Sequence, residues 1–195
     1  HLIITHSSES YTKEMANAKN LFHKRVDGLI ASLAFDTLNL NHFSPFIDKG
    51  VPVMFFDRVE QDGNNTVVII DNAKCGYQAT AHLIEQGCKR IAHITSSLKR
   101  NVYSQRYKGD LDALFDNGIP LNEKLIFVKD LSEKSGIEAA LEILKMKSMP
   151  DGAFITNDFI AAVCIRTFKE NGIKIPEDIA VVGFTNTNIP ELLDP

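Results

Sequence analysis

The sequence lacks the short motifs that mark common catalytic and phosphate-binding sites. Its 195 residues contain no GxGxxG, GxxxxGK[ST], GxSxG or HExxH, which excludes the usual phosphate-binding loops, the nucleophile elbow and the zinc helix. His82 and His93 have no companion ligands at metal spacing, so a structural or surface role is the better prediction for them. The chain is therefore not expected to be an enzyme, and no cofactor or metal is predicted.

Cysteine is scarce as well. Cys75, Cys88 and Cys164 are odd in number, have no CxxC spacing and stand among apolar neighbours. Three reduced and mostly buried thiols are the expected state. This usage favours a reducing, cytoplasmic location.

Long apolar runs and an excess of basic residues are also absent. No run approaches the ~18 apolar residues of a membrane span, and the first residues do not have the pattern of a signal peptide. The net charge is −4 and the pI is ≈ 5.9, whereas a nucleic-acid-binding surface usually has a basic face. The chain itself is thus not expected to bind DNA, and no membrane partner is expected.

What the sequence does have is a repeated signal at the ends of predicted helices. Gly50, Gly87, Gly118 and Gly172 each follow a helix-like stretch and precede an apolar one. Glycine at this place supplies the left-handed cap of a helix, and strands buried in a parallel sheet read as continuous apolar runs. The pattern predicts an α/β fold in which helices flank mostly parallel sheets.

The predicted elements alternate along the whole chain. Strands are predicted at residues 2–5, 27–32, 51–56, 66–70, 90–95, 125–129, 152–156 and 179–184. Helices are predicted at about residues 10–24, 36–49, 73–86, 104–117, 133–147 and 158–171, the second of them interrupted near Pro45. N-caps are predicted at Asn72, at Ser132 or Ser135, and at Asn157 or Asp158. A polar loop at residues 61–65 is the only linker-like stretch, and a lobe boundary is expected near Asp71.

The candidate binding residues follow the predicted strands, because ligands of open α/β sheets bind outside the carboxyl ends of the strands. The main candidates are Asp57, Arg58, Asn157, Asp158 and Thr185, with Arg100 and Arg106 after the strand at 90–95. Polar residues at the other strand ends include Ser32, Ser96, Asp130 and Asn186. Hydroxyls, amides, carboxylates and guanidinium groups together suit a small polar ligand. The alternative is that loop ends are polar in any case and several of these side chains only cap helices.

A series of motifs resembles the effector-binding core of the LacI/GalR (lactose-repressor and galactose-repressor) family of bacterial transcriptional regulators. They include Val68-Ile69-Ile70-Asp71-Asn72, Gly87-Cys88-Lys89-Arg90-Ile91-Ala92, Arg106-Tyr107-Lys108-Gly109, Thr156-Asn157-Asp158 and the run from Pro176 to Phe184. The resemblance covers essentially the whole chain. It implies a two-lobed, periplasmic-binding-protein-like fold with a sugar or other small effector between the lobes, the partial first lobe being residues 1–71 and the second 72–195.

The resemblance also implies that this chain is a fragment. The family's DNA-binding helix-turn-helix, its hinge helix and the first strand–helix pair of the core should precede His1. The crossover back to the first lobe should follow Pro195. Operator DNA is then a partner of the parent protein through its missing N-terminal domain, and the parent is expected to be a homodimer.

The family's binding positions are matched unevenly. Asp57, Arg106 and the pair Asn157 and Asp158 match residues of the family's cleft. Thr185 departs from the family, because Gly183-Phe184 is usually followed by an aspartate that accepts hydrogen bonds from sugar hydroxyls or from a base.

Two consequences for the effector follow from the resemblance. The missing carboxylate puts ordinary hexose recognition in doubt and favours an anionic effector, unless Asn186 or Asp158 takes over the acceptor role. Leu131 is apolar where some relatives place an aromatic residue, which weighs against a purine.

Two functions other than transcriptional regulation are compatible with this fold. A solute-binding receptor of a sugar transporter has the same fold, and a signal peptide upstream would distinguish it. The three unpaired cysteines and the run from Pro176 to Phe184 weigh against the receptor. An enzyme on this fold is the third possibility, and no nucleophile, base or metal set supports it.

Overall fold

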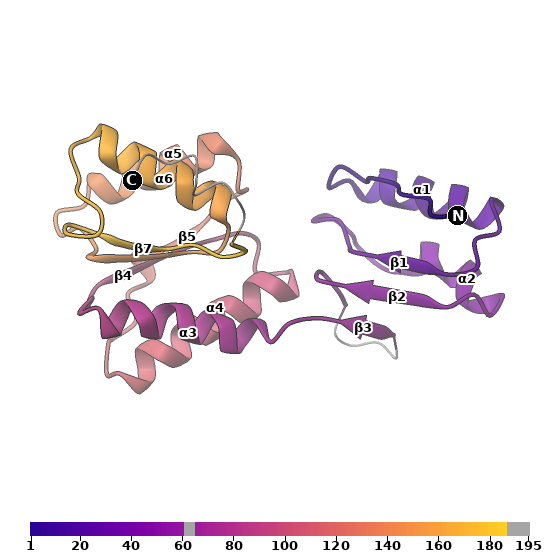
Figure 1. Cartoon of the computed structure of the whole chain (residues 1–195), viewed down its shortest axis with the longest axis horizontal. Helices are drawn as coiled ribbons and strands as arrows, with labels where there is room; N and C mark the ends of the chain where they lie inside the picture. Colours follow the sequence, from indigo (N-terminus) through magenta and orange to yellow (C-terminus); the bar gives the residue numbers. More distant parts are fainter. Residues whose placement is uncertain (61–64, 187–195) are drawn as a thin grey trace. The chain divides into compact units, whose positions relative to one another are not determined.

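The computed structural model describes residues 1–60 and 65–186, and the chain divides into two units. One unit is His1–Ile70 with Arg100–Val102, and the other is Asp71–Lys99 with Tyr103–Pro195 (Figure 1). Most of the predicted linker at residues 61–65 lies outside the described residues. The identification of these units with the family's two lobes, at 1–71 and 72–195, stays a prediction.

The first unit contains a parallel three-stranded sheet. Its elements are α1 (Tyr11–His23), β1 (Leu29–Ala31), the 3-10 helix η1 (Asn41–Phe43), α2 (Ser44–Asp48), β2 (Val53–Phe56) and β3 (Thr66–Val68). The strand order is β1-β2-β3, with Leu29 opposite Val53 and Met54 opposite Thr66. All three strands run in the same direction, so their carboxyl ends meet at one edge.

The core of the first unit lies on one face of this sheet. Leu21 of α1 and Phe46 of α2 are buried together with Phe55 of β2. The residues that point to the other face, such as Ile30 and Phe56, are 64% and 43% exposed. Both helices therefore cover the same face of the sheet.

Of the elements predicted for this unit, one is absent and one is shorter than expected. Residues 2–5 form no strand, and Leu2 and Ile4 are 85% and 82% exposed. Their apolar sequence favours a strand, but a strand needs a ladder partner, and the described strands do not supply one. The interruption expected near Pro45 in the helix at 36–49 is confirmed, because Pro45 lies in the first turn of α2 and not in a helix interior. The helical part is shorter than predicted and consists of η1 and α2.

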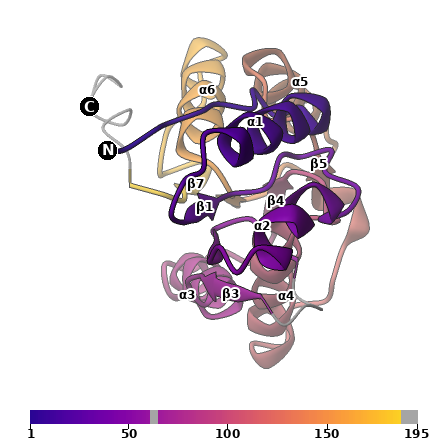
Figure 2. The same ribbon diagram turned by 90° about the vertical axis from the view of Figure 1, so that its right-hand side faces the viewer.

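The second unit is a four-stranded parallel sheet with helices on both faces. Its elements are α3 (Asn72–Glu85), β4 (Ile91–Thr95), α4 (Asn101–Asp116), the 3-10 helix η2 (Glu123–Leu125), β5 (Ile126–Val128), α5 (Glu133–Leu144), β6 (Gly152–Ile155), α6 (Asp158–Glu170) and β7 (Ala180–Val182). The strand order is β5-β4-β6-β7. Figures 1 and 2 show α3 and α4 on one face of this sheet and α5 and α6 on the other.

Burial in the second unit follows from these two layers. Every residue of β4 and of β6 is buried, as expected for central strands of a parallel sheet covered on both sides. Leu83 and Leu114 pack with Phe154 on the face of α3 and α4. Ile143 and Phe168 lie in the core on the other face. The predicted fold class is thus confirmed, and no helix among the described residues is long and apolar enough to span a membrane.

Local signals at helix ends are largely confirmed. Ser132 accepts a hydrogen bond from the N–H of Ser135, and Asn157 accepts one from the N–H of Ile160, as N-caps do. At α3 the cap is Asp71 and not the predicted Asn72. The capping glycines at 50, 87, 118 and 172 all have positive φ.

Candidate functional site

In the second unit, the polar residues after the strands come together at the carboxyl edge of the sheet. Ile94 of β4 lies opposite Ile155 of β6, so the residues that follow them are neighbours. The Thr156 hydroxyl lies 3.2 Å from the Thr95 hydroxyl, and both threonines are buried. Two hydroxyl groups are therefore buried side by side at this edge.

Arg106 of α4 lies at this edge and is only 8% exposed. Its Nε donates to Oδ1 of Asn72 over 2.9 Å, and its Nη1 donates to the carbonyl oxygen of Thr156 over 3.0 Å. Its guanidinium carbon lies 3.7 Å from the ring centre of Phe184, in cation–π geometry. An arginine keeps its charge in any such environment, so a positive group is oriented at this edge.

Two helical glycines allow the close approach that places Arg106. A Cβ atom at Gly76 would overlap the backbone of Arg106, and one at Gly109 would overlap the carbonyl oxygen of Ala73. Helices α3 and α4 therefore touch through their backbones. This contact brings Asn72, at the start of α3, within hydrogen-bond distance of Arg106.

Asp158 and Thr185 border a cavity of about 490 Å³ beside β7. The cavity is otherwise lined mainly by apolar residues of α3, α6 and β7, with Asn186 at the same end as Thr185. Gly183 leaves room for the Asp158 carboxylate, since a Cβ atom at this position would lie 2.5 Å from Oδ1 of Asp158. Asp158 is also the first residue of α6, where the helix dipole favours a carboxylate.

Asn157 has a structural role. Its side-chain oxygen accepts the N–H of Ile160 over 3.1 Å and caps α6, so the capping alternative applies to this residue. Asp130, another residue near a strand end, accepts hydrogen bonds from the backbone N–H of Ser132 and from nearby hydroxyls, which lowers its pKa to about 2. Of the predicted residues in this unit, the structure brings Asp158 and Thr185 to one cavity and orients Arg106 at the same sheet edge.

At the carboxyl edge of the first unit, two of the predicted arginines bind backbone carbonyls. Arg58 donates its Nε to the carbonyl of Leu33 over 2.7 Å and pairs with Glu9 over 2.8 Å. Arg100 donates to the carbonyls of Phe35 and Thr37. Both arginines thus hold the loop after β1, residues 33–37, which frames this edge.

Asp57 and Ser32 complete this edge. Asp57 directly follows β2 and adopts a left-handed backbone, with φ 55°, and its carbonyl accepts the side-chain amide of Asn101 over 2.9 Å. Ser32 directly follows β1, and its hydroxyl oxygen is buried without a hydrogen-bond partner among the described residues. Such an oxygen is unusual in a folded protein and marks a place where a ligand or water can donate.

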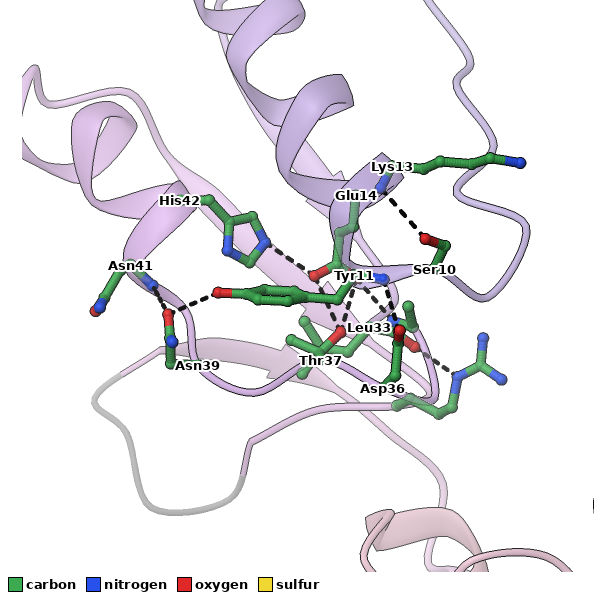
Figure 3. A network of polar contacts seen from close by, with 12 residues as sticks. Ser10, Tyr11, Lys13, Glu14, Leu33, Asp36, Thr37, Asn39, Asn41 and His42 are labelled. Atoms are coloured by element: carbon green, nitrogen blue, oxygen red, sulfur yellow. Dashed lines mark hydrogen bonds and ion pairs between the residues drawn. The ribbon is translucent and has the colours of Figure 1, made fainter.

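The same loop is held from its other side by Glu14 of α1, which sequence reasoning missed (Figure 3). This buried carboxylate accepts the N–H of Ala34 over 2.7 Å and the hydroxyl of Thr37 over 3.0 and 3.1 Å. Its Oε1 lies 2.9 Å from Nε2 of His42, although neither ring nitrogen of His42 has hydrogen-bond geometry. Burial lowers the pKa of His42, and the nearby Glu14 opposes this shift.

Residues 80–195 match the periplasmic binding protein-like domain. The chain belongs to this family. The repressor PurR of Yersinia pestis (strain Pestoides F) is 33% identical over 196 residues, which are all of this chain and 57% of that protein. The chain thus spans a little over half the length of this curated relative.

Two solved structures of regulators have the same fold. The transcription regulator CcpA of Lactococcus lactis is 26% identical with a TM-score of 0.87, and the match covers 98% of this chain and 69% of that one. A sugar-binding transcriptional regulator of the LacI family from Escherichia coli, in complex with phosphate, is 27% identical with a TM-score of 0.78 over 94% and 66% of the two chains. These relatives are regulators and not enzymes, and the resemblance to a LacI-type effector-binding core is confirmed.

Proposed function

We propose that this chain senses a small polar effector, a sugar or a sugar derivative, and thereby modulates DNA binding by its parent protein. The observation that carries the proposal is the oriented, buried guanidinium of Arg106 at the carboxyl edge of the second sheet. We assign effector binding to Arg106, Asp158 and Thr185 in this unit, with Asn157 in a capping role. In the first unit we also assign effector binding to Asp57, Arg58 and Arg100, which lie at the carboxyl edge of the sheet.

An anionic sugar derivative is the first candidate for the effector. Thr185 supplies a hydroxyl where the family usually has a carboxylate, so an acidic ligand group meets less repulsion. Arg106 supplies a fixed positive charge at the same sheet edge, and the relative from Escherichia coli was solved with phosphate bound. A phosphate or carboxylate group on the sugar fits both features.

A neutral sugar is the second candidate, and one observation favours it. The Asp158 carboxylate borders the same cavity as Thr185, so it is available to accept the hydrogen bonds of sugar hydroxyls. In this case Asp158 binds the sugar in place of the aspartate that the family usually has where this chain has Thr185.

The effector acts by binding two states of the regulator unequally. It can shift DNA affinity only by its differential affinity for those states, typically ~1–3 kcal/mol of coupling. A cytoplasmic homodimer suits this role, because operators with near-twofold symmetry are read by twofold proteins.

Calorimetry on the complete regulator tests the proposal. The panel pairs glucose with glucose 6-phosphate and with gluconate. Micromolar binding of the phosphate or the acid, with at least tenfold weaker binding of glucose, supports the anionic effector. Micromolar binding of glucose that is unchanged in Thr185→Asp contradicts it, and failure of a wider sugar panel to bind contradicts the sugar class.

A further inference from the structure

A second cavity lies in the first unit, at the sheet edge opposite Asp57 and Arg58. Its volume is about 620 Å³, which is within the usual range of small-molecule sites. The lining comes from residues 22, 23 and 25–27, at the end of α1 and before β1, and from residues 46 and 49–51, at the end of α2 and before β2. The cavity thus lies at the amino ends of β1 and β2 and is separate from the proposed effector edge.

The floor of this cavity is apolar and continuous with the core of the unit. The rings of Phe22 and Phe46 meet edge to face with their centres 5.3 Å apart, and Phe46 is 1% exposed. Val26 and Val51 are half-buried and pack against the same core. A floor of aromatic rings and branched side chains suits a flat apolar group.

The rim of the cavity is positively charged. Arg25 and Lys49 are exposed on it and give two positive charges against the single negative charge of Asp27, with His23 beside them. Within the described part of the chain, no ion pair engages Arg25 or Lys49. These two cations are therefore available to an anion.

The backbone of Arg25 points to a role for its side chain. Its φ of 53° lies in the left-handed region, at the position that ends α1. The chain places glycine at the corresponding position after α2, α3, α4 and α6. Glycine adopts this conformation without strain, whereas a side chain there is disfavoured, and strained residues are concentrated at functional sites.

We propose that this cavity binds a small organic anion with a flat apolar group, of the class of aryl phosphates and aromatic carboxylates. The apolar group lies on the half-buried side chains of Phe22, Val26 and Val51, and the acidic group is bound by Arg25 and Lys49. The site does not depend on the effector proposal, since it uses other residues at the opposite edge of the sheet.

Phenyl phosphate is the probe, with inorganic phosphate and phenol as its two halves. A titration of the chain followed by amide NMR should show saturable shifts at residues 22–27 and 46–51. Phenyl phosphate should bind at least about tenfold more tightly than either half, because the charge-assisted and apolar contacts both contribute. Equal binding of inorganic phosphate, or no saturable shifts at these residues, overturns the proposal.

Arg25→Gly separates binding from folding. Glycine relieves the left-handed backbone, so the fold should be kept while affinity for phenyl phosphate falls roughly tenfold, the loss expected for one charge-assisted contact. Lys49→Gln should cause a similar loss. The matched control is Lys24→Gln, which removes a neighbouring exposed cation that does not line the cavity. If Arg25 and Lys49 only complement the helix ends, both variants will keep wild-type affinity, and the proposal is wrong.

Discussion

The guanidinium carbon of Arg106 lies 3.7 Å from the centre of the Phe184 ring. The same side chain donates to Asn72 at the start of α3 and to the carbonyl of Thr156 after β6. Three segments that are distant in the sequence thus orient one charged group. Because this orientation exists without a ligand, little side-chain entropy would be lost if Arg106 binds the effector as we propose.

Replacing Arg106 with alanine should weaken effector binding roughly ten- to a hundredfold, because charge-assisted hydrogen bonds worth ~1.5–3 kcal/mol are removed. Arg106→Lys should recover little of this loss, since lysine lacks the planar fork of donors. Calorimetry on the complete regulator, with the ligand selected from the sugar panel, measures the effect. Arg166→Gln, which removes an exposed cation paired with Glu133, is the control and should have no effect. Wild-type affinity in Arg106→Ala would show that Arg106 is not a ligand contact.

Adding a methyl group at Gly109 should destabilise the second unit. The new Cβ atom would overlap the carbonyl oxygen of Ala73, and only separation of α3 from α4 can relieve the overlap. We expect Gly109→Ala to lower the free energy of unfolding by about 1–3 kcal/mol in urea titrations. Gly28→Ala is the matched control, because its nearest new contact would be at an ordinary 3.6 Å. Equal stability of the two variants would contradict the backbone contact.

Removing the Glu14 carboxylate should loosen the loop after β1. In Glu14→Ala no carboxylate oxygen remains to accept from the N–H of Ala34 or the hydroxyl of Thr37. Leaving a buried donor unsatisfied costs about 1–3 kcal/mol, so amide exchange at Ala34 should become roughly tenfold faster or more. Glu138→Ala, on the exposed face of α5, provides the control. Unchanged exchange at Ala34 would mean that the arginines alone hold the loop.

The stability of the first unit should fall as the pH drops below 6.5. Burial lowers the pKa of His42 from its ordinary value of 6.5, so the unfolded chain binds the proton more readily than the folded one. The contribution of neutral His42 to the free energy of unfolding is therefore fully present above pH 6.5. It is lost as the pH falls through the lower pKa that His42 has in the folded chain. Urea unfolding at pH 7.5 and 5.5, with tyrosine and loop amides as probes, should show a smaller pH effect in His42→Gln. An identical pH dependence in that variant would assign the effect to other groups.

The helix ends and most of the strands were predictable from local sequence. Ser132 and Asn157 cap their helices through hydrogen bonds to N–H groups three residues away, and glycine ends four helices through its own backbone. Each of these signals involves only residues that are close together in the sequence. The segment at 2–5 shows the limit of this reasoning, because an apolar run becomes a strand only when another strand pairs with it.

The position of the candidate site was predictable from the sequence, but the hydrogen bonds that hold its residues were not. The sequence by itself determined a parallel α/β fold, and with it the edge of each sheet where Arg106, Asp158 and Thr185 lie. Only the tertiary structure decided that Arg58 and Arg100 bind the carbonyls of the loop at 33–37 and that Glu14 binds its N–H and hydroxyl groups. The reason is physical, since these partners are 20 to 65 residues apart, and backbone carbonyls carry no signature in the sequence.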